Sequence, residues 1–581
     1  TEDVQVKADK SMIFGSKSGL ELYSNSFYKA LPTLKNGFMQ DKMCDVGAVS
    51  NTDTFIKQGA YNTETATSWS WGALKNVNYF IDGCNDPKYC TVEAETRDNY
   101  LGIARWFRAW FYYDKLTTYG EVPWFPNDIQ SYQNDVMYKD RDSRDVIIRN
   151  LIADLDFAYE HIQATSSTGS ATLTRWAAAA LKSRVCLFEA AYRRYHNLTG
   201  LEITPEELYR EAAKAAKLVI DNSGCSLNTA AGKKGAYRDL FYSETPLTQE
   251  VILAVCANEK SGIFGEQNWW FNARSYGLCW SLVRSFVHTY LKQDGTPFTA
   301  AADYAVKSFA EEMEGRDLRL EQTVRGRNFL WDGKTAVADI KNLSLTGYQV
   351  IKYTLDESKY DGGAKNINSI PLIRYAEVLL NYAEAQAELG VITDSEWALT
   401  VGALRKRAGI TGGTETLPTT VDSYLQRTFY PDVTSPVLLE IRRERAIELV
   451  AEGMRFDDLR RWKCGSLMET LPWSGIHIPG LEQPVDVNGD GVNDYYFTEG
   501  EVASAPAAYK NIAVRVNQDG VGLYAEANPV SGYDLVYKTG AGDRYWYPDG
   551  RQYLYPIPAK VIRDYRNAGY TISQNPEWDN E

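Results

Sequence analysis

The chain has 581 residues, with 62 Lys and Arg against 76 Asp and Glu, which gives a formal net charge of −14 at pH 7. This length exceeds the usual size of one hydrophobic core, and the acidic balance, without a block of Lys and Arg, argues against a nucleic-acid partner. The 15 Trp and 39 Tyr beside only four His favour a hydrogen-bonding recognition surface over a catalytic centre, because flat aromatic faces also stack on sugar rings and nucleobases.

The first candidate ligand face lies in residues 40–67, a long segment without a sustained helical or strand period. It leads into Trp69 and Trp71, whose indoles, two positions apart, could lie parallel and contact a ligand. The alternative is that Trp71 begins the next helix and packs in the core, which is the interpretation we favour for that residue. Asp41 and Asp45 could hydrogen-bond ligand hydroxyls, although carboxylates in loops are usually only solvated.

Three helices are predicted next. From Arg97 onward, apolar residues recur at helical spacing on two neighbouring stripes, until Gly120 and Pro123 end the pattern. A second helix over residues 174–195 carries four consecutive alanines, which permit close approach of another helix. A third, over residues 205–222, has a proline and acids in its first turn. Helices of this kind are expected to pack on more than one side.

The middle of the chain, residues 226–362, is loop-rich and aromatic. Its β-branched runs at 251–255 and 348–355 predict short strands. Helical spacing returns at 371–390, where a polar stripe would form the solvent-exposed face of the helix: Glu377, Asn381, Glu384 and Glu388.

The last third of the chain begins with a charged helix. This helix starts near Pro436, runs to Trp462, and is dense in opposite charges at helical spacing, such as the pairs Glu440–Arg443 and Arg445–Glu448. Residues 472–550 are rich in Gly, Asp, Asn and Tyr, and we expect loops there.

A calcium-binding pattern lies within this loop region. Asp486, Asn488 and Asp490 occupy positions one, three and five, and a glycine follows at six, as in the opening of a calcium loop, where hard oxygen ligands converge on a tight turn. Val492, through its carbonyl, and Asp494 would complete the set. Position twelve departs from the pattern, with Phe497 in place of Glu, so another acid would have to compensate: Asp494, Glu499 or Glu501. The alternative is an ordinary Asn/Asp/Gly turn; we expect no required cofactor beyond this structural calcium.

The eight cysteines lack zinc-ligand spacing, and Cys84 and Cys90 bracket a turn that a small disulfide could close. The longest apolar stretches are interrupted by Lys and Arg before reaching a membrane-spanning length. The polar opening TEDVQVKADK is what a removed signal segment would leave.

An ordered set of segments resembles the SusD/RagB family of nutrient-binding lipoproteins of Bacteroidetes. The segments cover nearly the whole chain, and their ordered combination is highly specific. They include RWFRAWFYYDKLTTYGEVP at 105–123, the alanine-rich 174–188, RSFVHTYLKQDG at 284–295, GRDLRL at 315–320, and the C-terminal segments 371–390, 403–409, 444–462 and 553–578.

The resemblance implies a mainly α fold: tetratricopeptide-like helical hairpins as scaffold, plus a loop-rich variable region with a few short strands. We expect one compact body in which residues 1–235 hold the first hairpins and residues 236–581 hold the variable ligand-face loops and the later hairpins. The family places glycan contacts near the central segment, which adds candidate aromatic residues: Trp269, Trp270, Tyr276, Trp280 and, in a nearby turn, Trp331.

The implied function is capture of oligo- or polysaccharide at the cell surface and its delivery to a SusC-type TonB-dependent transporter, which the protein covers as a lid. The resemblance also implies a lipid anchor to the outer membrane, upstream of Thr1. Two rival functions remain: a peptide-binding tetratricopeptide-type protein, and a helical glycoside hydrolase, which would need two facing carboxyls. The acids lie mostly at helical spacing beside arginines, and no nucleophile elbow, phosphate loop or metal triad is present, so we expect no catalytic residues and no enzyme activity.

Overall fold

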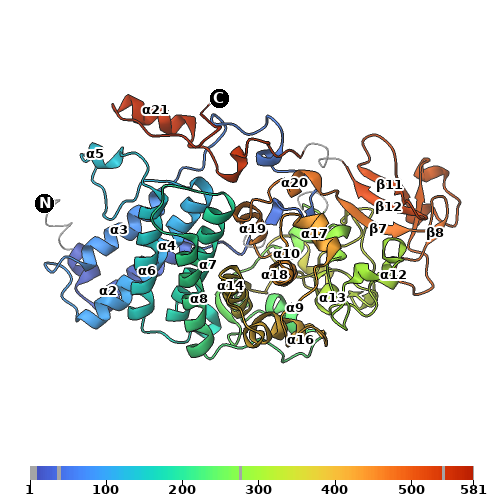
Figure 1. Ribbon diagram of the computed structural model, residues 1–581, viewed down its shortest axis with the longest axis horizontal. Coiled ribbons are helices and arrows are strands. Elements are labelled where there is room, and N and C mark those ends of the chain that lie inside the picture. Colours follow the sequence, from blue (N-terminus) through green and yellow to red (C-terminus); the bar gives the residue numbers. More distant parts are fainter. Residues whose placement is uncertain (1–8, 36–40, 274–277, 539–543, 580–581) are drawn as a thin grey trace.

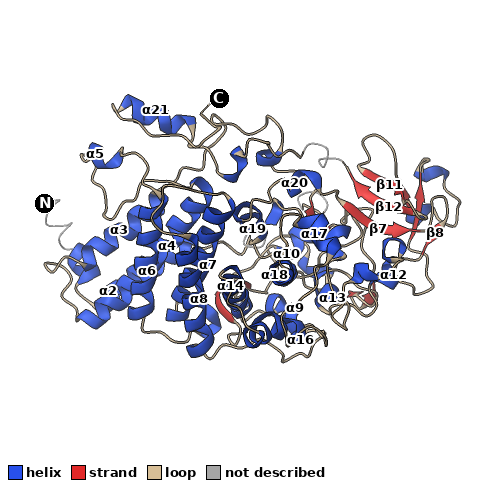
Figure 2. Ribbon diagram, in the orientation of Figure 1, coloured by secondary structure: helices blue, strands red, loops and turns tan. Residues whose placement is uncertain are grey.

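The computed structural model of the protein describes residues 9–35, 41–273, 278–538 and 544–579. Helices are the predominant regular structure, and the larger strands gather at the end opposite the N-terminal helices (Figure 2). This arrangement confirms the predicted mainly α fold with a few short strands. Among the described residues, no helix is both long and apolar enough to cross a membrane.

The N-terminal helices stand side by side (Figure 1). Contacts link α4 to α6, α6 to α7 and α7 to α8 in succession. The alanines of α7 are fully buried, and the Trp106 indole N–H of α4 donates to the Ala177 carbonyl at 3.1 Å, so the small residues do permit close packing. The helices are α2 (Lys17–Asn25), α3 (Gly72–Cys84), α4 (Ala94–Tyr119), α5 (Asn134–Met137), α6 (Arg144–His161), α7 (Arg175–Tyr195) and α8 (Pro205–Asn222).

Local signals explain where these helices begin and end. Thr204 and Glu207 form a capping box at the start of α8, with Pro205 in the first turn. Gly120 ends α4 with a φ of 72°, a left-handed conformation that glycine adopts without a Cβ clash. The three helices predicted from the sequence are therefore confirmed.

The segment 371–390 is not one helix. Its first residues form β6 (Ile370–Arg374), which pairs antiparallel with β2 (Val251–Val255), and α14 (Tyr375–Glu388) follows directly. The strand predicted at 251–255 is therefore confirmed. The run at 348–355 makes only isolated bridges, at Gln349 and Val350, because the chain turns between Ile351 and Thr354.

The polar face of α14 is buried, contrary to the predicted solvent-exposed face. Glu377 pairs with Arg184 of α7 at 2.6 Å, Glu384 pairs with Arg461, and Asn381 accepts a hydrogen bond from Arg445. This side of the helix packs against arginine-bearing helices, so its carboxylates are neutralised inside the protein instead of being solvated.

The charged helix is divided in two. α18 (Pro436–Glu448) ends in a turn where Ala451 and Gly453 have positive φ, and α19 (Arg455–Arg461) begins after it. The predicted pair Glu440–Arg443 forms, whereas Arg445 pairs with Asp458 of α19 and not with Glu448.

The C-terminal region contains more strand than expected. β11 (Leu523–Ala527), β12 (Tyr533–Tyr537) and β7 (Ser474–Ile478) form one antiparallel sheet. β10 (Ala513–Arg515), β9 (Tyr495–Thr498) and β8 (Pro484–Val485) form a mixed sheet, in which β10 is parallel and β8 antiparallel to β9. These strands are short and separated by Gly- and Asn-rich turns, which concealed their period of two in the sequence.

Short elements fill the remainder. The strands are β1 (Gly47–Ala48), which pairs with β3 (Ser281–Leu282), and the hairpin of β4 (Leu330–Trp331) and β5 (Lys334–Thr335). The helices are α9 (Ala236–Tyr242), α10 (Gln267–Asn272), α11 (Arg284–Val287), α12 (Phe309–Glu312), α13 (Arg319–Thr323), α15 (Asp394–Trp397), α16 (Ala403–Arg407), α17 (Ser423–Phe429), α20 (Leu467–Thr470) and α21 (Ala559–Asn567).

Two further expectations concern the disulfide between Cys84 and Cys90 and the division of the chain at residue 235. Cys84 and Cys90 are free thiols, so the small disulfide is absent from the described structure. The division at residue 235 stays a prediction; it falls just before α9, and α14 packs against α7 and α8 across it.

Candidate ligand-binding site

A groove with a volume of about 840 Å³ opens beside the start of α3. The first turn of α3 forms one wall, residues 123–138 form the floor, and α21 from the C-terminal end of the chain forms the opposite wall. In Figure 1 α21 and α5 lie along the same edge of the molecule as α3. We call this cavity the aromatic groove; its ring-bearing lining residues are Trp69, Trp71, Phe125, Tyr138 and Tyr565.

Trp69 and Trp71 both line the aromatic groove, but their rings are not parallel. Their centroids are 5.2 Å apart and their planes are 60° apart, so the expected parallel platform is wrong. Trp71 packs against Phe111, Phe125 and Tyr112, which anchors it to the core. Trp69 remains half-buried, edge-on to Tyr119 at 5.0 Å.

Polar groups surround the aromatic rings. Lys75 of α3 pairs with Asp128 at 2.7 Å, and Asn127 donates to Asp82 at 2.8 Å. On the opposite wall Asp564 pairs with Lys560. Exposed pairs of this kind exchange readily with water or ligand hydroxyls because they contribute little to stability.

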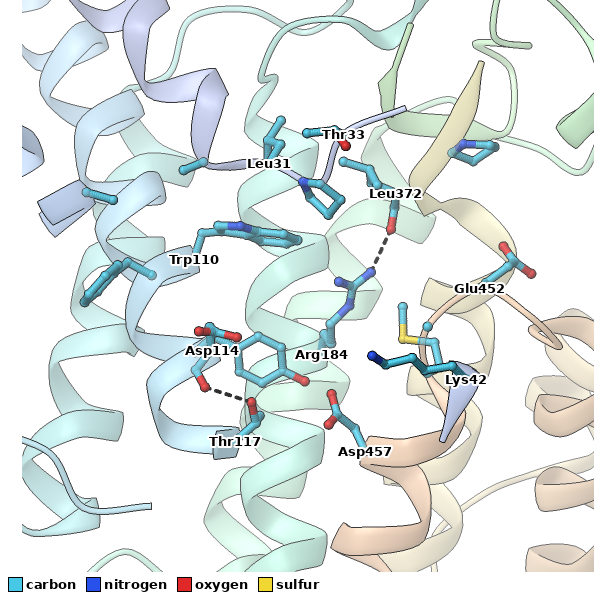
Figure 3. A pocket seen from close by; sticks show the side chains of 18 of the residues that line it. Leu31, Thr33, Lys42, Trp110, Asp114, Thr117, Arg184, Leu372, Glu452 and Asp457 are labelled. Carbon is cyan, nitrogen blue, oxygen red and sulfur yellow. Dashed lines mark hydrogen bonds between the residues drawn. The ribbon is translucent and has the colours of Figure 1, made fainter. Parts of the chain in front are cut away.

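A second, inner chamber with a volume of about 680 Å³ lies between α4, α7 and the turn that leads into α19. Figure 3 shows the side chains of Trp110, Asp114, Arg184, Lys42 and Asp457 around it. Arg184 reaches the Leu372 carbonyl at 2.9 Å, and the Thr117 hydroxyl donates to the Asp114 carbonyl at 3.1 Å.

Ionisable side chains line the chamber, and the protein around them shifts their pKa values. Asp114 is exposed on the chamber wall, yet the surrounding protein raises the pKa of its carboxyl above the ordinary value, and burial lowers the pKa of its neighbour Lys115. Of the other carboxylates, Glu452 accepts hydrogen bonds from Lys352 and Arg374, and Asp457 pairs with Arg460.

A third, small hollow of about 20 Å³ lies beside α10, and Trp270, Phe271 and Trp280 line it. Lys42 lines both this hollow and the inner chamber, and the first turn of α3 lines both the chamber, through Ala73, and the aromatic groove, through Gly72. Shared or adjacent residues therefore line the three cavities, and we call the three together the ligand strip.

Two indole N–H groups along the ligand strip find no acceptor among the described residues. They belong to Trp71, at the aromatic groove, and Trp270, at the small hollow. Buried donors are normally paired, so an unpaired donor in a cavity wall marks a place where a bound molecule could supply the acceptor.

The other sequence candidates have different positions. Trp269 precedes Trp270 in α10, half-buried and edge-on to it at 5.2 Å. Trp331 lies in the β4–β5 hairpin, where the Arg325 guanidinium is 5.3 Å from its ring centroid. Tyr276 lies outside the described residues.

Three candidates are corrected, because their polar groups are used inside the protein. Asp45 is fully buried and forms a bidentate pair with Arg455 at 2.8 Å. Asp41 is buried and accepts the backbone N–H groups of Gly453 and Arg455 at the start of α19. Trp280 is buried, packs on Gly47 and donates its indole N–H to the Asp41 carbonyl at 3.2 Å.

The sequence did not single out Phe125, Tyr138, Tyr565 or Asp114. Tyr565 and Tyr138 make an edge-on ring contact at 5.2 Å although 427 positions separate them (565 − 138). No local pattern can indicate such a contact. One sequence signal could have indicated the groove, namely the aromatic Pro123-Trp-Phe-Pro segment after α4. The chain turns at the end of α4, and Phe125 of this segment contacts Trp71.

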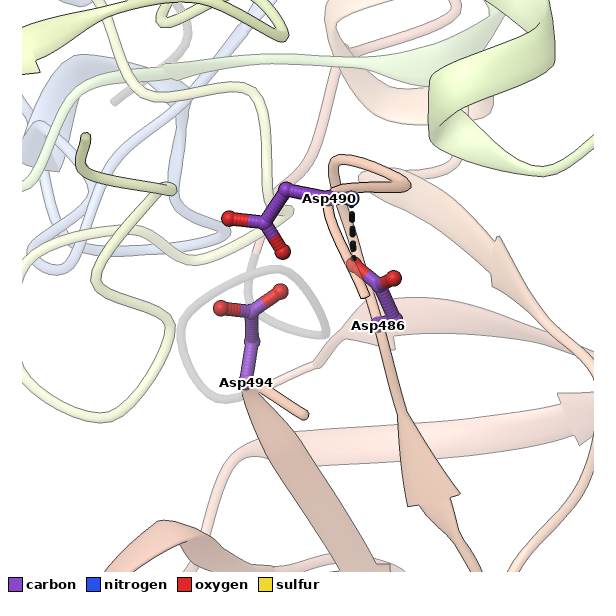
Figure 4. A group of neighbouring side chains, drawn as sticks. All are labelled: Asp486, Asp490 and Asp494. Atoms are coloured by element: carbon purple, nitrogen blue, oxygen red, sulfur yellow. Dashed lines mark hydrogen bonds between the residues drawn. The ribbon is translucent and has the colours of Figure 1, made fainter. Parts of the chain in front are cut away.

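The calcium-loop residues lie together at the far end of the molecule. Asp486, Asp490 and Asp494 place ligand oxygens within 4.8 Å of one another (Figure 4). Asn488 is buried beside them, and Val492 is exposed at the tip of the loop. Burial, with the neighbouring Asp490 and Asp486 carboxylates, raises the pKa of Asp494 to about 6.

Comparisons with known proteins give a consistent result. The SusD family profile matches residues 249–578. A solved SusD-like carbohydrate-binding protein from Bacteroides fragilis is 19% identical, over 96% of this chain and 99% of that one, with a TM-score of 0.68. A second SusD-like protein of that organism is 20% identical over 98% of both chains, with a TM-score of 0.66. A SusD homologue from Bacteroides thetaiotaomicron is 16% identical over 100% of both, with a TM-score of 0.63. No curated protein matches this chain.

Proposed function

Because this chain belongs to the SusD family, we propose that it is a non-catalytic glycan-binding protein of the bacterial cell surface. In this proposal it captures oligo- or polysaccharide on the ligand strip. It then delivers the glycan to a SusC-type TonB-dependent transporter, which it covers as a lid. A lipid anchor would hold it on the outer face of the outer membrane.

The observation that carries the proposal is the aromatic groove. Half-buried Trp69 and Tyr138 offer ring surface, while Lys75, Asp128 and Asn127 offer hydrogen bonds around it. A sugar ring presents an apolar face and a rim of hydroxyls, so it is complementary to such a surface. A carbohydrate-binding protein with the same fold supports this choice over a peptide ligand.

A neutral glycan suits the site better than an anionic one. The whole chain carries a net charge of −14, which repels polyanions at low ionic strength. In the ligand strip, Asp128 and Asp564 are paired with lysines, and their carboxylates can also accept hydrogen bonds from neutral hydroxyls.

The binding proposal is tested by affinity electrophoresis of the purified protein against a panel of neutral and anionic polysaccharides. We expect retardation by at least one neutral polysaccharide and none by anionic ones. Absence of retardation by every polysaccharide, together with binding to a peptide library, would favour the peptide-binding alternative.

The position of the site is tested by Trp69→Ala. Loss of one stacking aromatic side chain should weaken binding of the retarding glycan about tenfold or more, because such contacts contribute about 1–3 kcal/mol. The matched control is Tyr524→Ala in β11, an aromatic residue of the C-terminal sheet outside the ligand strip, which should bind like the native protein. Equal affinity of Trp69→Ala and native protein in titration calorimetry would place the site elsewhere.

The absence of turnover is tested separately by reducing-end release from the polysaccharide that binds. We expect none, because Glu452 and Asp457 of the chamber are already held in ion pairs. Release that disappears in Asp114→Asn would instead support a hydrolase that uses the chamber.

A further inference from the structure

The loop between β8 and β9 has the geometry of a cation site. Val485 and Tyr495 are paired across the two strands, so Asp486 and Asp494 leave the hairpin side by side, and the Asp494 N–H donates to the Val485 carbonyl at 2.8 Å. Gly489 and Gly491, with φ of 73° and 86°, fold the intervening residues into a tight turn.

The carboxylates converge on one point. Figure 4 shows those of Asp490 and Asp494 facing each other, with Asp486 beside them. Ligand oxygens of all three lie within 4.8 Å of one another. Oxygens on opposite sides of a calcium ion are roughly 4.6–5.2 Å apart, because each bond is about 2.3–2.6 Å long. The spacing of the three carboxylates is therefore compatible with one calcium ion bound by all of them.

Asn488 supplies an independent observation. Its side chain is only 3% exposed, and among the described residues its amide oxygen has no hydrogen-bond partner. The amide nitrogen lies 3.3 Å from an Asp490 carboxylate oxygen, so the amide group faces the acidic cluster. Rotation about the last torsion of this side chain turns the oxygen toward the same point, where a cation would satisfy it.

The missing position-twelve ligand sets the strength of the site. Phe497 is fully buried in the core, Glu499 accepts a hydrogen bond from Asn517, and Glu501 pairs with Arg515, so each of these residues is held elsewhere. The remaining ligands are the side chains of Asp486, Asn488, Asp490 and Asp494 and the carbonyl of Val492, with water completing the shell.

We propose that residues 486–494 form a structural calcium site, independent of glycan binding. The Arg327 guanidinium donates to the Asn488 carbonyl at 3.3 Å and pairs with Glu314, so the ion would fix this hairpin against the body of the protein. Without an ion, three carboxylates repel each other there.

The proposal is tested by calorimetric titration of calcium chloride into full-length protein from which EDTA has removed divalent cations. We expect one site with a Kd of about 10⁻⁵ to 10⁻³ M, the range of calcium loops with fewer acidic ligands, and much weaker binding of magnesium. Calcium should also raise the unfolding temperature measured in EDTA.

Asp490→Asn should weaken calcium binding at least about tenfold, because it removes one of the charged ligands. Asp519→Asn, at an exposed Asp-Gly turn of the same region, is the matched control and should bind like the native protein. Equal binding by native protein and Asp490→Asn would overturn the proposal, as would absence of binding at 10 mM calcium, roughly ten times the weak limit of such loops. If Asp490→Asn does not fold, competition of calcium with terbium on native protein, read by terbium luminescence, still decides whether the site exists.

Discussion

The carboxyl of Asp41 combines two opposing influences at a single residue. Burial penalises its charge, while the N–H groups of Gly453 and Arg455 at the start of α19 favour it. Burial is the larger effect and raises the pKa of Asp41 to about 7. The turn between α18 and α19 thus depends on an acid that changes charge near neutral pH.

The raised pKa of Asp41 predicts that the unfolding free energy of the protein depends on pH. Because the folded pKa lies above the unfolded value, the contribution of Asp41 is complete below about pH 4 and is lost as the pH rises through about 7. Relative to Asp41→Asn, the native protein should lose roughly 4 kcal/mol of unfolding free energy between about pH 4 and pH 8. Urea unfolding of both proteins across this range measures the difference, and a gap that does not change with pH would contradict the assignment.

Residue chemistry alone could not separate ligand residues from structural ones. Asp41, Asp45 and Trp280 have the same residue types as real glycan contacts, and they lie in segments of irregular pattern. Their roles are set by Arg455 and the turn at Gly453, more than 400 positions after Asp45 in the chain. Trp69 and Trp71 do line a groove, because the loop before α3 ends at the surface, and their contact with a ligand stays a prediction.

At the scale of elements, α18 connects three other elements of residues 236–581 through buried charge. Glu448 is fully buried and contacts Arg319 of α13 at 2.7 Å, Arg374 at the end of β6 at 2.9 Å, and Arg407 of α16. These arginines hold the pKa of Glu448 well below its usual range, against the opposing effect of burial. Its negative charge therefore binds three elements to one helix.

Glu448→Gln should destabilise the protein by about 3–5 kcal/mol, because it leaves buried guanidinium groups without their counter-charge. The control is Asp221→Asn, which removes a half-exposed i,i+4 pair with Lys217 and should cost less than about 0.5 kcal/mol. Denaturation midpoints measure both, and equal midpoints would show that the buried pairs contribute no more than the surface one.

Helix positions were predictable where the pattern is local. α8 begins where its proline and acids indicated, and α7 begins one residue after Thr174. The buried face of α14 was not predictable, because Glu377 and Glu384 look solvated until Arg184 and Arg461 are placed against them. Burial of an ion pair depends on both partners, and only the fold brings them together.

For the whole molecule, ordered motifs over nearly the full length sufficed to indicate the fold, because each motif marks a helix and their order sets the stacking. The C-terminal sheets were not predicted, because strands as short as Pro484–Val485 and Ala513–Arg515 contain too few residues to show the alternation of apolar and polar side chains. The aromatic groove was predicted only in part for another reason. One of its walls is α21, which lies almost 500 positions after Trp69 in the sequence, so no local pattern links the two.

The neighbouring positions of the cavities in the ligand strip have a consequence for ligand size. A short oligosaccharide can occupy the aromatic groove alone, whereas a longer chain can reach past Ala73 and Lys42 toward Trp270. Each further contact is then intramolecular, so affinity should rise with the number of sugar units and level off once the chain spans the strip.

Calorimetry with a graded series of oligomers measures this rise. In Trp270→Ala the plateau should move to shorter chains, while the shortest oligomers bind unchanged; a uniform loss at every length would contradict this arrangement. A protein of this design would discriminate polymers from their breakdown products by length.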